Sequence, residues 1–299
     1  MLKLFLSLLL VSTLSVSFSQ TSWADDDLLS SDVESGVRVE NEYKIKVPKE
    51  QTEELWVFFK KNFAPESESF FLRKYDPAFS VTFAEEYFQD VYYDTSKLDM
   101  VRMQSGIRHR TRVNPDNPDD RKHGRQLVQI KLKRNDGKAE NRTEVKYPVI
   151  EDTTQMDSAP PIGLIKKGKR EEFSKQLEEV GISPYGLKEI LTLSQKRRRV
   201  YISLKGVAFA TITLDECVSK KWWKTYQATE IEMEINEIGY TNANPKERKY
   251  MEKMTSVMKD HLLKSFPDAK VDQTPKYNKV FNFFESELPL FSFYTRHLL

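Results

Sequence analysis

The chain has 299 residues, of which 39% are hydrophobic and 31% are charged, and its formal net charge is +2. This length allows one large domain or two small ones with a real hydrophobic core. The near balance of 47 Lys and Arg against 45 Asp and Glu excludes the strongly basic domain that nucleic-acid binding requires, so no nucleic-acid partner is expected. The only cysteine, Cys217, excludes an intramolecular disulfide framework.

The first residues have the pattern of a secretory signal peptide. Lys3 supplies a short basic region, residues 4–18 are apolar, and Ser22-Trp23-Ala24 places small residues before an acidic run. We expect a signal peptide over residues 1–24, cleaved after Ala24, and export to the periplasm or the exterior. An uncleaved anchor is the alternative. Residues 25–36 are acidic and Ser-rich and are expected to form a disordered linker. No other segment is apolar enough to span a bilayer, so no stable span is expected after cleavage.

Eight regions alternate between polar and apolar residues with the period of a β-strand. They are residues 37–47, 89–94, 106–113, 126–134, 141–149, 196–205, 208–217 and 227–237. Apolar residues at helical spacing predict helices over 50–62 and 245–266, and residues 166–180 have the pattern of a charged helix that ends before Gly181. Prolines predict a loop at 115–120 and another at 159–161, the second as a seam between two halves of one domain. The aromatic tail, residues 280–298, is expected to pack on the rest of the domain.

One face of most of these strands carries sorted charges. Arginines share a face in 106–113, lysines in 126–134 and glutamates in 227–237. One charged strand face alone indicates a solvated sheet. Like charges at alternate positions repel, however, and a solvated face does not require them. A polyanion with metal ions does, because Arg and Lys pair with phosphate oxygens and carboxylates bind Mg²⁺ or Mn²⁺.

Eight strands can close into a barrel, with the charged faces inward and the apolar faces outward under the helices. The basic lumen candidates are Lys44, Arg108, Arg110, Arg112, Lys131, Lys133, Arg142, Lys146, Arg197 and Arg199. The less numerous acidic candidates are Glu40, Glu42, Glu144, Asp215, Glu230, Glu232 and Glu234. This basic excess suits a highly charged anion. An outer-membrane barrel is disfavoured because the amphipathic helices need the outer apolar face, and a lipocalin-like carrier because its lumen would be apolar.

These motifs, taken in chain order, resemble the signature of the CYTH superfamily, the triphosphate tunnel metalloenzymes. The resemblance begins with Glu40-x-Glu42-x-Lys44, which is similar to the family's ExExK motif. A second block resembles the family's YYDT…L…G..LRxR pattern, with His109 where Leu is usual; it contains Tyr92-Tyr93-Asp94-Thr95, Leu98, Gly106 and Arg110-x-Arg112. The later elements are Lys131-x-Lys133, Arg142-x-Glu144, Arg197-x-Arg199, Leu214-Asp215, Glu230-x-Glu232-x-Glu234 and Thr274-Pro275-Lys276-Tyr277.

The resemblance implies an α+β fold over residues 37–299, an antiparallel eight-stranded β-barrel tunnel with a charged lumen and flanking helices. It implies metal binding by Glu40, Glu42, Glu232 and Glu234. It also implies triphosphate binding by Lys44, Arg110, Arg112, Lys131, Lys133, Arg142, Arg197, Arg199 and Lys276. The implied catalytic residues are Glu42, Lys44 and Asp215, the last acting beside the metal or ordering a basic neighbour.

We therefore expect a Mg²⁺- or Mn²⁺-dependent phosphohydrolase that acts on inorganic triphosphate, short polyphosphate or an organic triphosphate such as thiamine triphosphate. Phosphoryl transfer depends mainly on positioning and charge neutralisation, and a metal can supply the nucleophilic water. One alternative is an exported, non-catalytic protein that binds polyphosphate or phosphorylated ligands. Another is a polyphosphate-polymerising domain similar to that of the vacuolar transporter chaperone proteins, which expects membrane spans elsewhere. A homodimer is compatible with these features.

Overall fold

The computed structural model describes residues 38–113, 126–134 and 141–297, without the side chains of residues 38–40 and 141. The expected signal peptide, the linker and the loop at 115–120 lie outside the described residues. Within them, no helix is long and apolar enough to cross a membrane.

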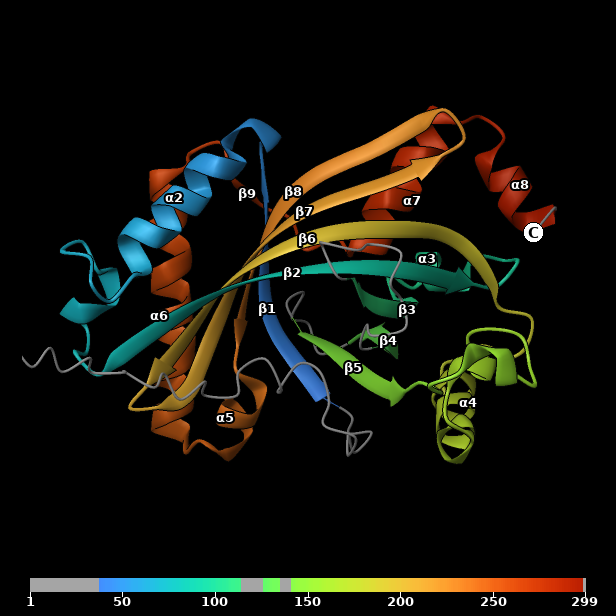
Figure 1. Ribbon diagram of the computed structural model, residues 1–299, viewed down its shortest axis with the longest axis horizontal. Coiled ribbons are helices and arrows are strands. Elements are labelled where there is room, and N and C mark those ends of the chain that lie inside the picture. Colours follow the sequence, from blue (N-terminus) through green and yellow to red (C-terminus); the bar gives the residue numbers. More distant parts are fainter. Residues whose placement is uncertain (1–37, 114–125, 135–140, 298–299) are drawn as a thin grey trace, which may run out of the picture. The chain divides into compact units, whose positions relative to one another are not determined.

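The described residues contain one antiparallel sheet of nine strands. The strands are β1 (Arg38–Val47), β2 (Phe79–Asp94), β3 (Gly106–Val113), β4 (Gln126–Lys133), β5 (Asn141–Pro148), β6 (Lys188–Leu204), β7 (Val207–Lys221), β8 (Lys224–Ile235) and β9 (Lys270–Val271). Their order is β5-β4-β3-β2-β6-β7-β8-β1-β9. β5 also pairs with the first residues of β1, where Arg142 lies opposite Glu40. Pairing therefore joins the two ends of the order formed by β1–β8 (Figure 1).

All eight predicted strand regions contain strands, but two of these strands begin much earlier than expected. β2 begins at Phe79, whereas the prediction began at 89. The first half of the strand was missed because burial does not alternate over residues 83–86. β6 begins at Lys188 rather than at 196. Its register with β2 shifts between Tyr92 and Tyr93, which lie opposite Leu191 and Glu189. Ile190 is therefore an extra residue in β6, and such a bulge breaks the period of two that predicts a strand.

The three predicted helices are present. They correspond to α2 (Thr52–Phe63), α4 (Arg170–Glu178) and α6 (Pro245–Ser265). At the start of α6, the Asn244 side chain accepts hydrogen bonds from backbone N–H groups, and Glu247 bonds back to the Asn244 N–H. This capping box explains why the start was readable from the sequence. The other helices are α3 (Asp99–Arg102), α5 (Glu237–Asn242), α7 (Lys276–Glu287) and α8 (Phe291–His297), with short 3₁₀ helices at Lys49–Gln51, Phe71–Lys74, Thr153–Gln155, Ile162–Leu164 and Lys167–Lys169.

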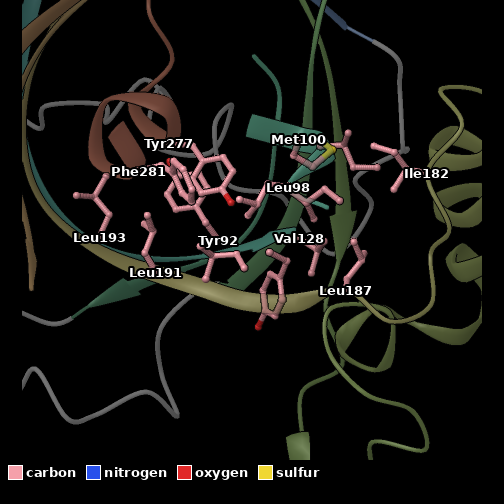
Figure 2. Packing of buried hydrophobic residues seen from close by; sticks show 14 of the residues in the cluster. Tyr92, Leu98, Met100, Val128, Ile182, Leu187, Leu191, Leu193, Tyr277 and Phe281 are labelled. Carbon is pink, nitrogen blue, oxygen red and sulfur yellow. The ribbon is translucent and has the colours of Figure 1, made fainter. Parts of the chain in front are cut away.

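The hydrophobic side chains form two buried clusters beside the sheet. The first contains Val128, Leu191 and Phe281, and it includes side chains from α4, α7 and α8 (Figure 2). The second contains Leu55 and Met254, and it joins α2 and α6 to the sheet. Residues from before and after 159–161 share both clusters, so this loop does not separate two cores. The helices cover the apolar faces of the strands, so the charged side chains of different strands contact one another.

Candidate functional site

The charged strand faces are buried rather than solvated. Side chains this deeply buried are seldom charged unless they are paired. The side chains of these faces that are less than 9% exposed include Glu42, Lys44, Glu86, Asp90, Arg108, Arg110, Arg142, Glu144, Arg197, Arg199, Asp215 and Glu230. They come from β1, β2, β3, β5, β6, β7 and β8. We call them, with the half-buried Glu232 and with Lys276, the charged cluster.

Three carboxylates of this cluster meet at one point. Asp215 on β7 lies opposite Glu230 on β8, and Glu232 follows on the same face of β8. One carboxylate oxygen from each lies within 4.8 Å of the others. Oxygen ligands of this kind suit hard divalent cations such as Mg²⁺ and Mn²⁺.

Lys276, the first residue of α7, places its ammonium group among the three carboxylates. Its Nζ lies 3.0 Å from Glu230 Oε1 and 2.9 Å from Glu232 Oε1, and it also pairs with Asp215. The next residue, Tyr277, fixes the start of the helix. Its hydroxyl donates to Asp94 Oδ2 at 3.0 Å, and its ring stacks on Tyr92 with centroids 4.9 Å apart (Figure 2). Lys276 is therefore held in place by its backbone.

Two further cations reach the same carboxylates. Lys44 Nζ on β1 lies 2.7 Å from Glu232 Oε1 and 2.6 Å from Glu42 Oε1. Arg197 Nη2 on β6 lies 2.6 Å from Asp215 Oδ2 and 3.0 Å from Glu232 Oε2. Acidic and basic groups therefore alternate across β1, β6, β7, β8 and the start of α7.

This alternation keeps the groups charged despite burial. Burial alone would raise the pKa of Asp215 and Glu232, but Arg197 and Lys276 lower the pKa of Asp215. Lys276, Lys44 and Arg197 hold the pKa of Glu232 well below its usual range. Burial alone would lower the pKa of Lys44 and Lys276, but the carboxylates raise both. At neutral pH, the two carboxylates are therefore ionised and the two lysines are protonated.

A second group of ion pairs surrounds Asp90 on β2, which is fully buried. Arg110 donates from Nε to Asp90 Oδ1 at 2.7 Å and from Nη2 to Oδ2 at 2.8 Å. Arg108 Nη1 donates to Asp90 Oδ2 at 2.9 Å, and Gln195 also donates to this oxygen. Burial would raise the pKa of Asp90, but the two arginines lower it far below its ordinary value. Asp90 thus fixes the guanidinium groups of two β3 arginines.

Glu86 plays a similar part farther along β2. Arg199 Nε lies 2.9 Å from Glu86 Oε2, and Arg112 pairs with the other carboxylate oxygen. Phe88 lies between the two acidic residues, and the guanidinium of Arg110 stacks over its ring, 4.5 Å from the centroid. The carboxylates of β2 therefore hold the β3 arginines and Arg199 of β6 in fixed positions.

The lysine side chains of β4 and β5 are more exposed than most of the charged cluster. Lys131 Nζ lies 3.5 Å from Glu144 Oε1, and Lys146 Nζ lies 3.4 Å from Glu144 Oε2. Arg142 is buried and donates to the Gln104 carbonyl oxygen at 2.8 Å. Lys133 is exposed, and its Nζ donates to the Gln104 side chain at 2.8 Å. Of the residues expected to bind phosphate, Lys133 is the one placed at the surface.

The carboxylate group differs from the set expected to bind metal. Glu232 belongs to it, but its neighbours are Asp215 and Glu230. Glu42 pairs with Lys44 instead, and Glu234 lies opposite Glu42 across the β1–β8 pairing. The side chain of Glu40 lies outside the described residues. Register across β7 and β8, rather than spacing along one strand, decides which carboxylates meet.

Sequence reasoning missed two acidic residues of the cluster, Glu86 and Asp90. Both lie on β2, on the same face as Phe88, and Glu86 falls in the part of β2 that was not predicted. Asp90 lies within the predicted region 89–94, and extending the alternation of that region upstream would have reached Glu86. Lys279 on α7 was also missed; its Nζ lies 2.8 Å from Glu230 Oε2, and one helical turn separates it from Lys276.

A CYTH domain family model matches residues 59–260 of the chain. This range contains β2–β8, and therefore most of the charged cluster. No curated protein matches the chain.

Several solved structures resemble the chain. One is a candidate adenylate cyclase from Bacillus halodurans, with 20% identity, a TM-score of 0.49 and coverage of 83% of this chain and 99% of that chain. A protein from Pyrococcus horikoshii OT3 has 18% identity, a TM-score of 0.44 and coverage of 82% and 99%. A candidate adenylyl cyclase from Hippeastrum, described as having a dominant triphosphatase activity, has 16% identity, a TM-score of 0.43 and coverage of 85% and 98%.

Proposed function

Because the chain belongs to the CYTH domain family, we propose that it is a triphosphatase that removes the terminal phosphate from a linear triphosphate. The substrate class is inorganic triphosphate, short polyphosphate or an organic triphosphate. The observation that carries this proposal is the meeting of buried arginines and lysines with a group of three carboxylates. The first can hold a polyanion and the second a divalent cation.

We infer that strands β1–β8 enclose an eight-stranded tunnel. Two observations support this inference. Pairing between β5 and β1 joins the two ends of the strand order, and side chains that alternate along the strands are buried although they are charged. In a small barrel, alternate residues of every strand face the interior. A tunnel would explain why these charges meet one another instead of solvent.

Phosphate binding falls to the basic side of the cluster. A guanidinium has five N–H donors, so an arginine held by one carboxylate can also donate to phosphate oxygens. Asp90 fixes Arg110, and Asp215 fixes Arg197 through two hydrogen bonds of 2.7 and 2.6 Å. Arginines fixed in this way lose little side-chain entropy when a ligand binds. Lys44 and Lys276 add point charges near the acidic group.

The residues present fit a divalent metal. Asp215, Glu230 and Glu232 each offer a carboxylate oxygen within 4.8 Å of the others, and such oxygens are the ligands that hard divalent cations prefer. We propose that these three residues hold Mg²⁺ or Mn²⁺. When bound, such an ion neutralises phosphate charge and activates the attacking water. Lys276 and Lys44 orient the carboxylates and position the phosphoryl group beside them.

We also propose that the protein is exported and cleaved after Ala24. The basic, apolar and small-residue regions at residues 1–24 support this. N-terminal sequencing of protein recovered from outside the cytoplasm tests it: the expected first residue is Asp25, and recovery of an intact Met1 would contradict cleavage.

Phosphate release tests the proposed reaction. The purified chain from Asp25 onward, incubated with tripolyphosphate, longer polyphosphates and organic triphosphates, should release phosphate with Mg²⁺ or Mn²⁺ and should stop with a chelator. Arg197→Gln should lower turnover at least tenfold, because it removes a fixed positive charge that would stabilise the reacting phosphoryl group. Lys133→Gln, at the exposed lysine, should keep most of it. Tight binding of these compounds without turnover would instead identify a non-catalytic binding protein.

A further inference from the structure

An exposed aromatic surface lies at the end of the β7–β8 hairpin, far along these strands from the charged cluster. The two strands are joined by Trp222 and Trp223 alone, and Lys221 pairs with Lys224 across the turn. Trp223 is 74% exposed and stacks on Trp222, with ring centroids 5.7 Å apart. Figure 1 shows α8 beside this end of the hairpin.

The hairpin turn and α8 form one surface. The Trp222 ring packs edge-on against Tyr294 of α8, with centroids 5.3 Å apart. Leu290, just before α8, is 67% exposed, and Phe293 on α8 is 55% exposed. We call Trp222, Trp223, Leu290, Phe293 and Tyr294 the aromatic tip. Soluble surfaces seldom expose large apolar side chains together unless the surface binds something.

The backbone of the turn strengthens this point. Trp222 has a φ of +51°, in the left-handed region where two-residue hairpin turns normally use Gly, Asn or Asp. A bulky aromatic residue is costly there. The Trp222 side chain packs edge-on against Tyr294 and Phe291 of α8, so this backbone conformation holds the turn against α8 and leaves Trp223 on the outside.

The residues around the aromatic tip distinguish between two kinds of partner. Lys220 and Lys221 precede the tryptophans and Lys224 follows them, while Arg296 lies exposed near the end of α8. Glu287 pairs with Lys224 at 2.6 Å, and Lys221 donates to the Ile190 carbonyl oxygen. Protein–protein interfaces are depleted in lysine. Membrane interfaces combine Trp and Tyr rings at headgroup depth with basic residues that meet anionic lipids.

We propose that the aromatic tip docks the protein peripherally on an anionic lipid surface, with the tryptophans at headgroup depth and Lys220 facing the lipid phosphates. The described residues, which begin at Arg38, belong to one compact unit. The chain from Asp25 onward therefore retains the fold and lacks the apolar leader, which would bind lipid by itself.

Vesicle sedimentation tests the proposal. The chain from Asp25 onward should bind vesicles of phosphatidylcholine with phosphatidylglycerol, and added salt should weaken binding. Trp223→Ala should reduce partitioning on the order of tenfold, from the lost ring burial. Lys220→Ala should reduce it about fivefold, and only when phosphatidylglycerol is present. Tyr185→Ala removes an aromatic ring that is 70% exposed elsewhere and should change nothing.

Two outcomes would overturn the proposal. One is that vesicles of phosphatidylcholine, with or without phosphatidylglycerol, show no binding that Trp223→Ala reduces. The other is self-association in analytical ultracentrifugation that Trp223→Ala abolishes, which would assign the aromatic tip to a second copy of the chain. Because the Trp223 side chain is 74% exposed, its removal should leave thermal unfolding unchanged, and triphosphate turnover in solution should be unaffected.

Discussion

Replacing Lys276 with Met tests whether the three carboxylates form a cation site. The Lys276 ammonium lies within 3.0 Å of Glu230 and Glu232 and also pairs with Asp215. Removing one partner of a buried ion pair typically costs about 3–5 kcal/mol. Each carboxylate keeps another cation, since Arg197 pairs with Asp215, Lys44 with Glu232 and Lys279 with Glu230. We therefore expect the low end of the range, about 3 kcal/mol, measured as the free energy of unfolding in urea.

A divalent cation should restore part of this loss. With the ammonium absent, Mg²⁺ or Mn²⁺ can take its place among the carboxylates, and an ion at about 100 times its Kd adds about 2.7 kcal/mol. The gain with metal should be larger in Lys276→Met than in the unchanged chain. Lys224→Met removes a lysine from a surface pair with Glu287, so it should cost less than about 1 kcal/mol. Equal metal responses in all three proteins would refute the reasoning.

Three other changes probe the charged cluster. Glu42→Gln should keep the fold but lower metal-dependent turnover, because Lys44 loses a partner at 2.6 Å; unchanged phosphate release would contradict this. Asp90→Asn should cost about 3–5 kcal/mol in urea unfolding, because two arginines lose their carboxylate, and tripolyphosphate should stabilise this variant more than the unchanged chain; an equal ligand shift would argue against anion binding there. Folding lowers the pKa of Asp90 and of Asp215, so both carboxylates stabilise the fold at pH values above their pKa in the unfolded chain. The free energy of unfolding should therefore fall as the pH drops below about 4; a free energy of unfolding that does not change with pH would contradict the pairing.

Much of this site could be predicted from the sequence because strands alternate. Because alternate residues of a strand point to the same side, Arg197, Arg199 and Tyr201 must share one face of their strand. Glu230 and Glu232 must share one face of theirs for the same reason. Assigning these residues to strands was therefore enough to predict that the two arginines share one face and the two glutamates another. The capping residues of α6 were equally local.

What could not be predicted depends on pairing between strands. The meeting of Asp215 with Glu230 follows from their register, which no spacing within β7 or β8 encodes. Likewise, Asp90 lies directly opposite Arg110 in the β2–β3 pairing, so its role needs the partner strand. Lys276 reaches the carboxylates because Tyr277 is bonded to Asp94, a contact across most of the chain.

The pattern of ion pairs suggests how anion and cation binding are connected. Buried ion pairs contribute little net stability compared with apolar packing, so a fold does not need this many of them. Here the cations expected to hold phosphate, Arg197 and Lys276, are themselves held by Asp215. A divalent ion on the carboxylates would weaken their pull on these cations and leave more of the cations' charge for phosphate, and phosphate would in turn leave more of the carboxylates' charge for the ion. Each ligand therefore removes the competitor of the other, and binding free energies that are linked in this way must be reciprocal.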